Sequence, residues 1–156
     1  NSLTLEIPDL KAKSFELDIS MGILFHELVH VLFRRLGGKK FIKKAINKLK
    51  LPPKISRDCT LSTFEMISET TANSLTPYGY LIRRFYGRSF ENKLFTKKNL
   101  EIMSSSFKEF RQGNVKNPYR LIKYFVWSNY PVILEYLDNG KIDQAFVERI
   151  ALFYKR

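Results

Sequence analysis

Two short segments near the N-terminus alternate apolar and polar residues. Residues 3–7 (LTLEI) and 14–19 (SFELDI) each place apolar residues at every second position, which is the spacing of a strand with one buried face. Pro8 and Asp9 lie between them and favour a turn. The pattern therefore predicts a small N-terminal β-hairpin or sheet.

A long apolar segment follows, from Ser20 to Leu36. Ser20 is a favourable residue for capping a helix N-terminus. Gly37 and Gly38 follow the last apolar position, as glycines commonly do at a helix C-terminus. A helix that is apolar almost all round is typical of a buried core, so we expect this helix to be enclosed by the rest of the domain.

The remaining pattern predicts more helices, separated by proline, glycine and asparagine. They cover residues 39–51, 61–75, 78–86, 92–112, 118–137 with a break at Pro131, and 143–154. The helix over 39–51 is basic and amphipathic, which suits either a membrane surface or the domain's own core, and we favour the core. The predicted fold class is α+β, mostly α, with the small sheet at the N-terminal end.

The composition is that of a globular protein. The chain has 156 residues, of which 44% are hydrophobic, enough for one core without cross-links. We expect a single domain over residues 1–156, with a core unit over 1–89 and a helical C-terminal subdomain over 90–156. The one cysteine, Cys59, excludes an internal disulfide and favours a reducing, cytoplasmic location. No apolar run reaches the ~18 residues of a transmembrane segment.

The net charge of +12 attracts anionic surfaces and nucleic acid. The lysines are scattered along the chain, and the sequence contains no RNA-recognition, zinc-finger or helix-turn-helix signature. We therefore expect weak association with anionic surfaces or nucleic acid through net charge. A protease linked to DNA would instead require tight, salt-sensitive binding.

Both histidines of the chain lie in one segment, FHELVH, residues 25–30. His26 and His30 are four residues apart, so on a helix both project from one face and can reach one metal ion. Glu27 lies about 100° round the helix from His26, where its carboxylate can reach a water on the metal. Two unpaired imidazoles and a carboxylate would be costly in a core. The segment therefore predicts a metal site, and zinc suits such ligands.

A third ligand is required, and no other histidine exists. Cys59 is one source, but nothing in its loop orients it. The segment 64–75, FEMISETTANSL, is the better source, because Glu65, Glu69 and Asn73 recur every four residues and line one helical face. A solvated acidic face is the alternative, but the apolar neighbours favour a stripe that faces inward.

HExxH on one helix with a glutamate ligand on a second helix resembles the gluzincin group of zinc metallopeptidases. The residues ETTAN, 69–73, are similar to the ExxAD of HtpX-type and CAAX-processing peptidases and to the ExxAN of ImmA/IrrE-like peptidases. The resemblance covers residues 14–75, and small minigluzincin zymogens share the same scaffold. It implies a zincin-like fold, with the zinc ligands His26, His30 and Glu69, and Asn73 as the residue that orients a ligating histidine.

A second register is open. Residues 65–69, EMISE, are similar to the ExxSD of thermolysin-like enzymes, which would make Glu65 the ligand and Glu69 its support. We favour Glu69, because a neutral Asn73 suits a buried supporting position and Ala72 is small where two helices must approach closely.

The resemblance implies hydrolysis of peptide bonds in a polypeptide substrate. Zinc would activate a water and polarise the scissile carbonyl, and Glu27 would act as general base. The oxyanion needs a further donor, for which the candidates are Tyr78, Tyr80 or Arg83, or a tyrosine from the C-terminal half; we favour Tyr78 or Tyr80. The strand over 14–19 is expected to receive an extended substrate at its edge.

Two other functions are compatible with the same residues. One is a latent or catalytically weak gluzincin-scaffold protein with a regulatory or binding role, in which the aromatic C-terminal half fills the cleft as in a zymogen. The other is an ImmA-like peptidase that acts on a repressor.

Overall fold

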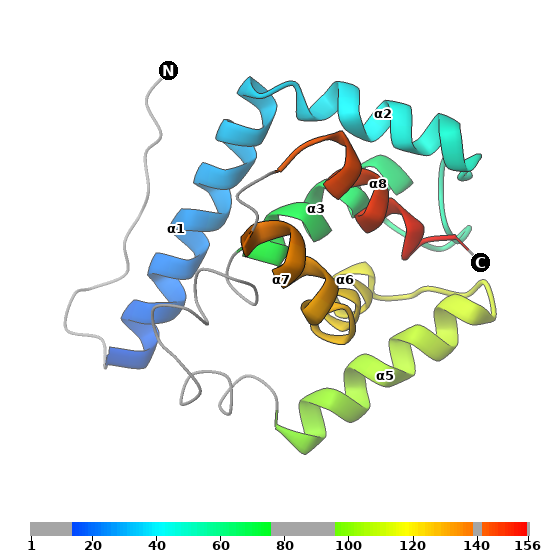
Figure 1. Ribbon diagram of the computed structural model, residues 1–156. Helices are drawn as coiled ribbons and strands as arrows, with labels where there is room; N and C mark the ends of the chain where they lie inside the picture. Colours follow the sequence, from blue (N-terminus) through cyan, green and yellow to red (C-terminus); the bar gives the residue numbers. More distant parts are fainter. Residues whose placement is uncertain (1–13, 76–95, 139–141, 156) are drawn as a thin grey trace.

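The computed structural model describes residues 14–75, 96–138 and 142–155, and these residues form a helical fold (Figure 1). The helices are α1 (Ser14–Arg35), α2 (Gly38–Leu49), α3 (Thr63–Leu75), α5 (Lys97–Arg111), α6 (Pro118–Ser128), α7 (Tyr130–Asp138) and α8 (Gln144–Leu152). The described ranges contain no strand. The predicted α+β fold with an N-terminal β-hairpin is therefore wrong.

The segment predicted as the second strand, residues 14–19, forms the beginning of α1. Six alternating residues are a short window, and extending an existing helix adds one hydrogen bond per residue without a new nucleus. A lone hairpin, in contrast, is marginally stable. Ser20 consequently lies inside the helix, and the proposed substrate-binding strand edge does not exist. Residues 3–7 lie outside the described ranges.

The predicted glycine end of the first helix is confirmed. The last residue of α1 is Arg35, and Gly37 has φ 82°, in the left-handed region that favours glycine. Gly38 begins α2 so close to α1 that an added Cβ would lie 2.5 Å from the Phe33 ring. The two glycines thus allow the chain to reverse and α2 to pack against the end of α1.

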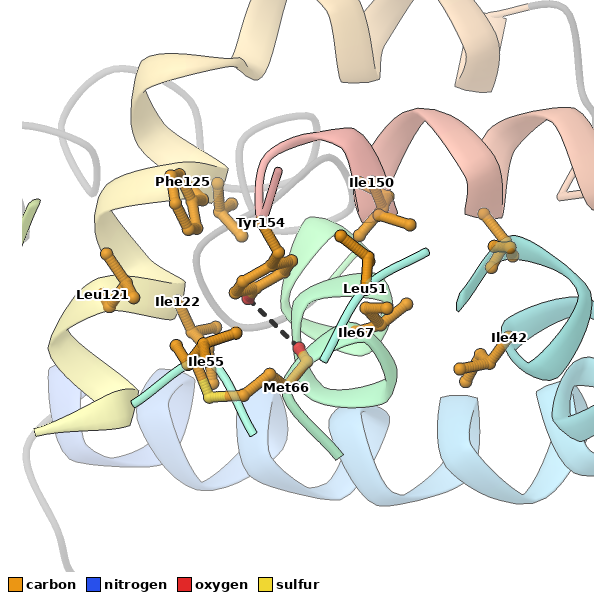
Figure 2. Close-up of a cluster of buried hydrophobic side chains, with 14 of the residues drawn as sticks. Ile42, Leu51, Ile55, Met66, Ile67, Leu121, Ile122, Phe125, Ile150 and Tyr154 are labelled. Carbon is orange, nitrogen blue, oxygen red and sulfur yellow. Dashed lines mark hydrogen bonds between the residues drawn. The ribbon is translucent and has the colours of Figure 1, made fainter. Parts of the chain in front are cut away.

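α3 is the central helix, and it packs against α1, α2, α6 and α8. The main core (Figure 2) takes residues from both sides of position 90. Met66, Ile67, Val126 and Ile150 are all fully buried within it. The apolar residues of α2 also pack on the core: Ile42 is 1% exposed, and Leu49 is partly buried against it. The prediction that this helix packs on the core is therefore confirmed.

The C-terminal end of the chain is fastened to α3. Tyr154 is 2% exposed, and its hydroxyl donates to the carbonyl of Met66 at 3.2 Å (Figure 2) and is hydrogen-bonded to the hydroxyl of Thr70. Burial raises the pKa of Tyr154 far above its ordinary value, although the Thr70 hydrogen bond opposes this shift. These contacts hold Met66 and Thr70, which lie on either side of Glu69 along α3.

The prediction that α1 is enclosed on all sides is wrong. Phe33 is buried and Val29 packs against the core, on the side where α1 meets α3 and α2. Ile23, Leu28 and Leu32 are 50%, 41% and 49% exposed. The apolar pattern of a helix does not show how much of its surface the other helices of the fold cover. None of the described helices combines the length and the apolar character needed to cross a bilayer.

Candidate metal centre

Three side chains from two helices meet where α1 packs against α3. The Nε2 atoms of His26 and His30 each lie 3.2 Å from a different carboxylate oxygen of Glu69. The two Nε2 atoms are 3.0 Å from each other. The side chains are 12%, 19% and 26% exposed, for His26, His30 and Glu69 respectively. The three side chains therefore form a small triangle, in which two nitrogens and two carboxylate oxygens are shielded but reachable from solvent.

The size of this triangle fits a zinc ion. Zinc binds imidazole nitrogen and carboxylate oxygen at about 2.0–2.2 Å in tetrahedral geometry, so two of its ligand atoms lie about 3.3 Å apart. The two Nε2 atoms are 3.0 Å apart, and each lies 3.2 Å from its nearest carboxylate oxygen of Glu69. Two histidine nitrogens and a single oxygen of Glu69 would leave the fourth position open, as in catalytic zinc sites.

The hydrogen-bonding pattern gives a second argument for a cation. If both imidazoles donated from Nε2 to Glu69, the two N–H groups would confront each other across 3.0 Å. A cation at the centre removes this conflict, because it lets the lone pairs of both nitrogens and the carboxylate face the same point. The chemistry of the donor set therefore fits a bound divalent metal better than a hydrogen-bonded cluster.

Glu69 is suited to serve as an anionic ligand. Burial by itself raises the pKa of this carboxyl, but hydrogen bonds from His26 and His30, and the charge of these imidazoles, outweigh the effect. Together they lower the pKa of Glu69 from its ordinary value of 4.5 to about 2. The carboxylate is accordingly ionised at neutral pH.

Glu65 lies one turn earlier on α3 and caps the start of this helix. Its carboxylate accepts hydrogen bonds from the backbone N–H and the hydroxyl of Ser62, both at 2.7 Å. The N–H of Glu65 in turn donates to the Ser62 hydroxyl at 3.2 Å. This reciprocal pair is a capping box, and it holds Glu65 at the exposed start of α3. The structure thus brings Glu69 to the histidines and leaves Glu65 outside the group.

The other predicted residues fall into two groups. Glu27 is exposed and Asn73 donates from Nδ2 to the carbonyl of Glu69 at 2.8 Å, so their roles as base and as support for a histidine stay predictions. Tyr78, Tyr80 and Arg83 lie outside the described residues.

A pocket of about 90 Å³ opens beside His30. It is lined by His30, Phe33, Arg34, Lys39, Ile42, Phe64 and Ser68, which come from α1, α2 and α3. Sequence reasoning missed this pocket. Arg34 follows His30 by four residues, so its place on the same face was available from helix periodicity. Lys39 and Phe64 reach the pocket only through the packing of α2 and α3.

No protein-family model, curated protein or solved structure matches this chain. The resemblance to gluzincins accordingly rests on the residues of the two motifs alone.

Proposed function

We propose that this protein is a zinc-dependent peptidase of the gluzincin type. The observation that supports the proposal is the convergence of His26, His30 and Glu69 at zinc-like separations. The HExxH spacing places a further carboxylate, Glu27, next to these ligands in the sequence. A structural zinc site would be closed by a fourth protein ligand, whereas the group found among the described residues has three members.

When bound, zinc supplies a polarised water and a Lewis acid for the scissile carbonyl. His26, His30 and Glu69 hold the ion. Glu27 takes the proton of the attacking water and passes it to the leaving amine, which is the role of a general base and then of a general acid. Its exposure leaves its carboxylate accessible to both water and substrate.

The pocket beside His30 is the proposed place for a substrate side chain. Phe33, Ile42 and Phe64 give it apolar walls, while Arg34 and Lys39 are positively charged. Among the residues that the structure describes, no acidic one lines it. A side chain with a short apolar stem and a terminal carboxylate matches this lining.

The test is cleavage of unfolded casein and of fluorogenic peptides by the protein in the presence of zinc. Replacing Glu27 by glutamine should lower kcat/KM by about 10²–10⁴-fold and leave zinc binding intact. The matched control is Glu101→Gln, an exposed glutamate on α5, which should keep full activity. Zinc binding without any cleavage would favour the regulatory or latent alternative instead.

A further inference from the structure

A second and larger hollow lies away from the metal centre. Its volume is about 600 Å³, within the range of small-molecule sites. The end of α2, the segment 51–57, the turn at Gly113 and residues 154–155 together form its walls. It shares no lining residue with the group of His26, His30 and Glu69. The proposed peptidase activity therefore leaves this pocket without an assigned role.

The charges round this pocket all have one sign. Lys50, Lys54, Arg57 and Lys155 line it, and no acidic residue of the described ranges does. Lys54 donates to the carbonyl of Cys59 at 3.2 Å, which anchors its ammonium group. The other three form no ion pair with the described residues, in contrast to Lys48, which pairs with Glu148 on α8. All four residues are exposed, and their common positive charge favours an anion in the pocket.

The backbone conformation of Lys50 is a second, independent observation that points to a function at this pocket. Its φ is 54°, and it is the only non-glycine residue with positive φ among the described residues. It follows α2 as the C-cap, a position at which glycine or asparagine avoids the strain of the left-handed conformation. A lysine in this conformation lowers stability, and such outliers concentrate where a side chain is needed for function.

We propose that this pocket binds a phosphate-bearing small molecule. A phosphoryl group accepts paired hydrogen bonds from an arginine and point-charge contacts from lysines, which Arg57, Lys50 and Lys155 can supply. Leu51 and Ile55 give the pocket an apolar wall for the uncharged part of the ligand. Nucleic acid carries the same phosphate chemistry, but the volume of about 600 Å³ suits one nucleotide-sized molecule.

The test is calorimetric titration of the full chain with adenosine monophosphate, inorganic pyrophosphate and a short single-stranded oligonucleotide at 0.15 M salt. The pocket variant carries Lys50→Gln, Arg57→Gln and Lys155→Gln. The control variant carries Lys97→Gln, Lys98→Gln and Lys108→Gln, three exposed lysines of α5, and loses the same net charge.

We expect the pocket variant to bind the monophosphate or pyrophosphate at least 30-fold more weakly, and the control variant to stay within threefold of the original chain. Binding of the oligonucleotide alone, lost in the pocket variant and kept in the control, would assign the same phosphate site to a nucleic acid. Equal loss in both variants would show attraction by net charge only. That result, or no binding of any of the three probes, would overturn the proposal.

A single variant separates binding from folding. Lys50→Gly relieves the left-handed strain, so its thermal unfolding midpoint should equal or exceed that of the original chain while anion binding weakens severalfold. Unchanged binding together with higher stability would show that Lys50 has no part in a site.

Discussion

Glu69 and Thr70 are neighbours on α3, but their polar groups have different surroundings. The Thr70 hydroxyl is fully buried; it donates to the carbonyl of Met66 at 2.8 Å and is hydrogen-bonded to Tyr154. The Glu69 carboxylate is 26% exposed and lies between two imidazoles. The first is a hydrogen-bonded network within the core, and the second is a set of ligand atoms directed at one point.

The difference shows how one helix can present a buried hydrogen-bonded network on one side and a partly exposed group of potential ligands on the other. Buried polar groups add little cost when each finds a partner within the protein. The two imidazole nitrogens and the two carboxylate oxygens, at separations of 3.0–3.2 Å, support instead the proposal of a shared cation. Substitutions in the Thr70–Tyr154 network should therefore lower stability, whereas substitutions in the triangle should lower metal affinity.

The largest expected effect is on zinc affinity, with Glu69→Gln and Glu65→Gln as a matched pair. Glu69→Gln should weaken zinc binding by more than about 100-fold, beyond the range for a residue that only supports a ligand. Glu65→Gln should leave zinc affinity within a few-fold and affect mainly the capping box of α3, by about 1 kcal/mol or less. Competition with a chelator measures both. The reverse ranking would favour the thermolysin-like register, with Glu65 as the ligand.

The next effect is on the pH dependence of the free energy of unfolding, measured without metal. The pKa of Glu69 is depressed to about 2 in the folded state, below its ordinary value, so the carboxylate contributes stability above pH ~4.5 that is lost as the pH falls toward 2. The contribution is at most about 3 kcal/mol. Chemical denaturation of the original chain and of Glu69→Gln should therefore give free energies of unfolding that differ most above pH ~4.5 and converge near pH 2. A difference independent of pH would contradict the ionised carboxylate.

The smallest effect is expected from Tyr154→Phe. This change removes the hydrogen bonds of the tyrosine hydroxyl to Met66 and Thr70, while Thr70 keeps its own bond to the Met66 carbonyl. The free energy of unfolding should fall by about 1–2 kcal/mol, measured by denaturant titration. Zinc affinity should change less than twofold. A larger loss of affinity would mean that the core network and the metal centre are coupled through α3.

Local sequence signals predicted most of the helices but not their environment. Asn117 and Pro118 mark the start of α6, where the Asn117 side chain accepts from the N–H of Arg120. The break expected at Pro131 lies at Asn129, with Pro131 in the first turn of α7, because proline is tolerated there. The spacing of Ser62 and Glu65 in the sequence also predicts a capping box, which would have separated Glu65 from the candidate ligands His26, His30 and Glu69.

Other features depended on contacts between distant segments. Alternation over residues 14–19 indicated a strand, but continuity with α1 decided the outcome. The apolar pattern of α1 indicated burial, but the fold covers only part of its surface. The two pockets join side chains from three or more segments, and no periodicity within one segment can reveal such a meeting.

By itself the sequence determined that His26 and His30 share a helix face, because a separation of four residues is close to one helical turn. It also determined that the helix ends at the two glycines, because glycine adopts the left-handed conformation of Gly37 without strain. The tertiary structure alone decided that Glu69 meets the histidines, since this requires α3 to be fixed between α1 and the helices α6 and α8. Helix geometry is set by neighbours in the chain, but the approach of two helices depends on the whole core.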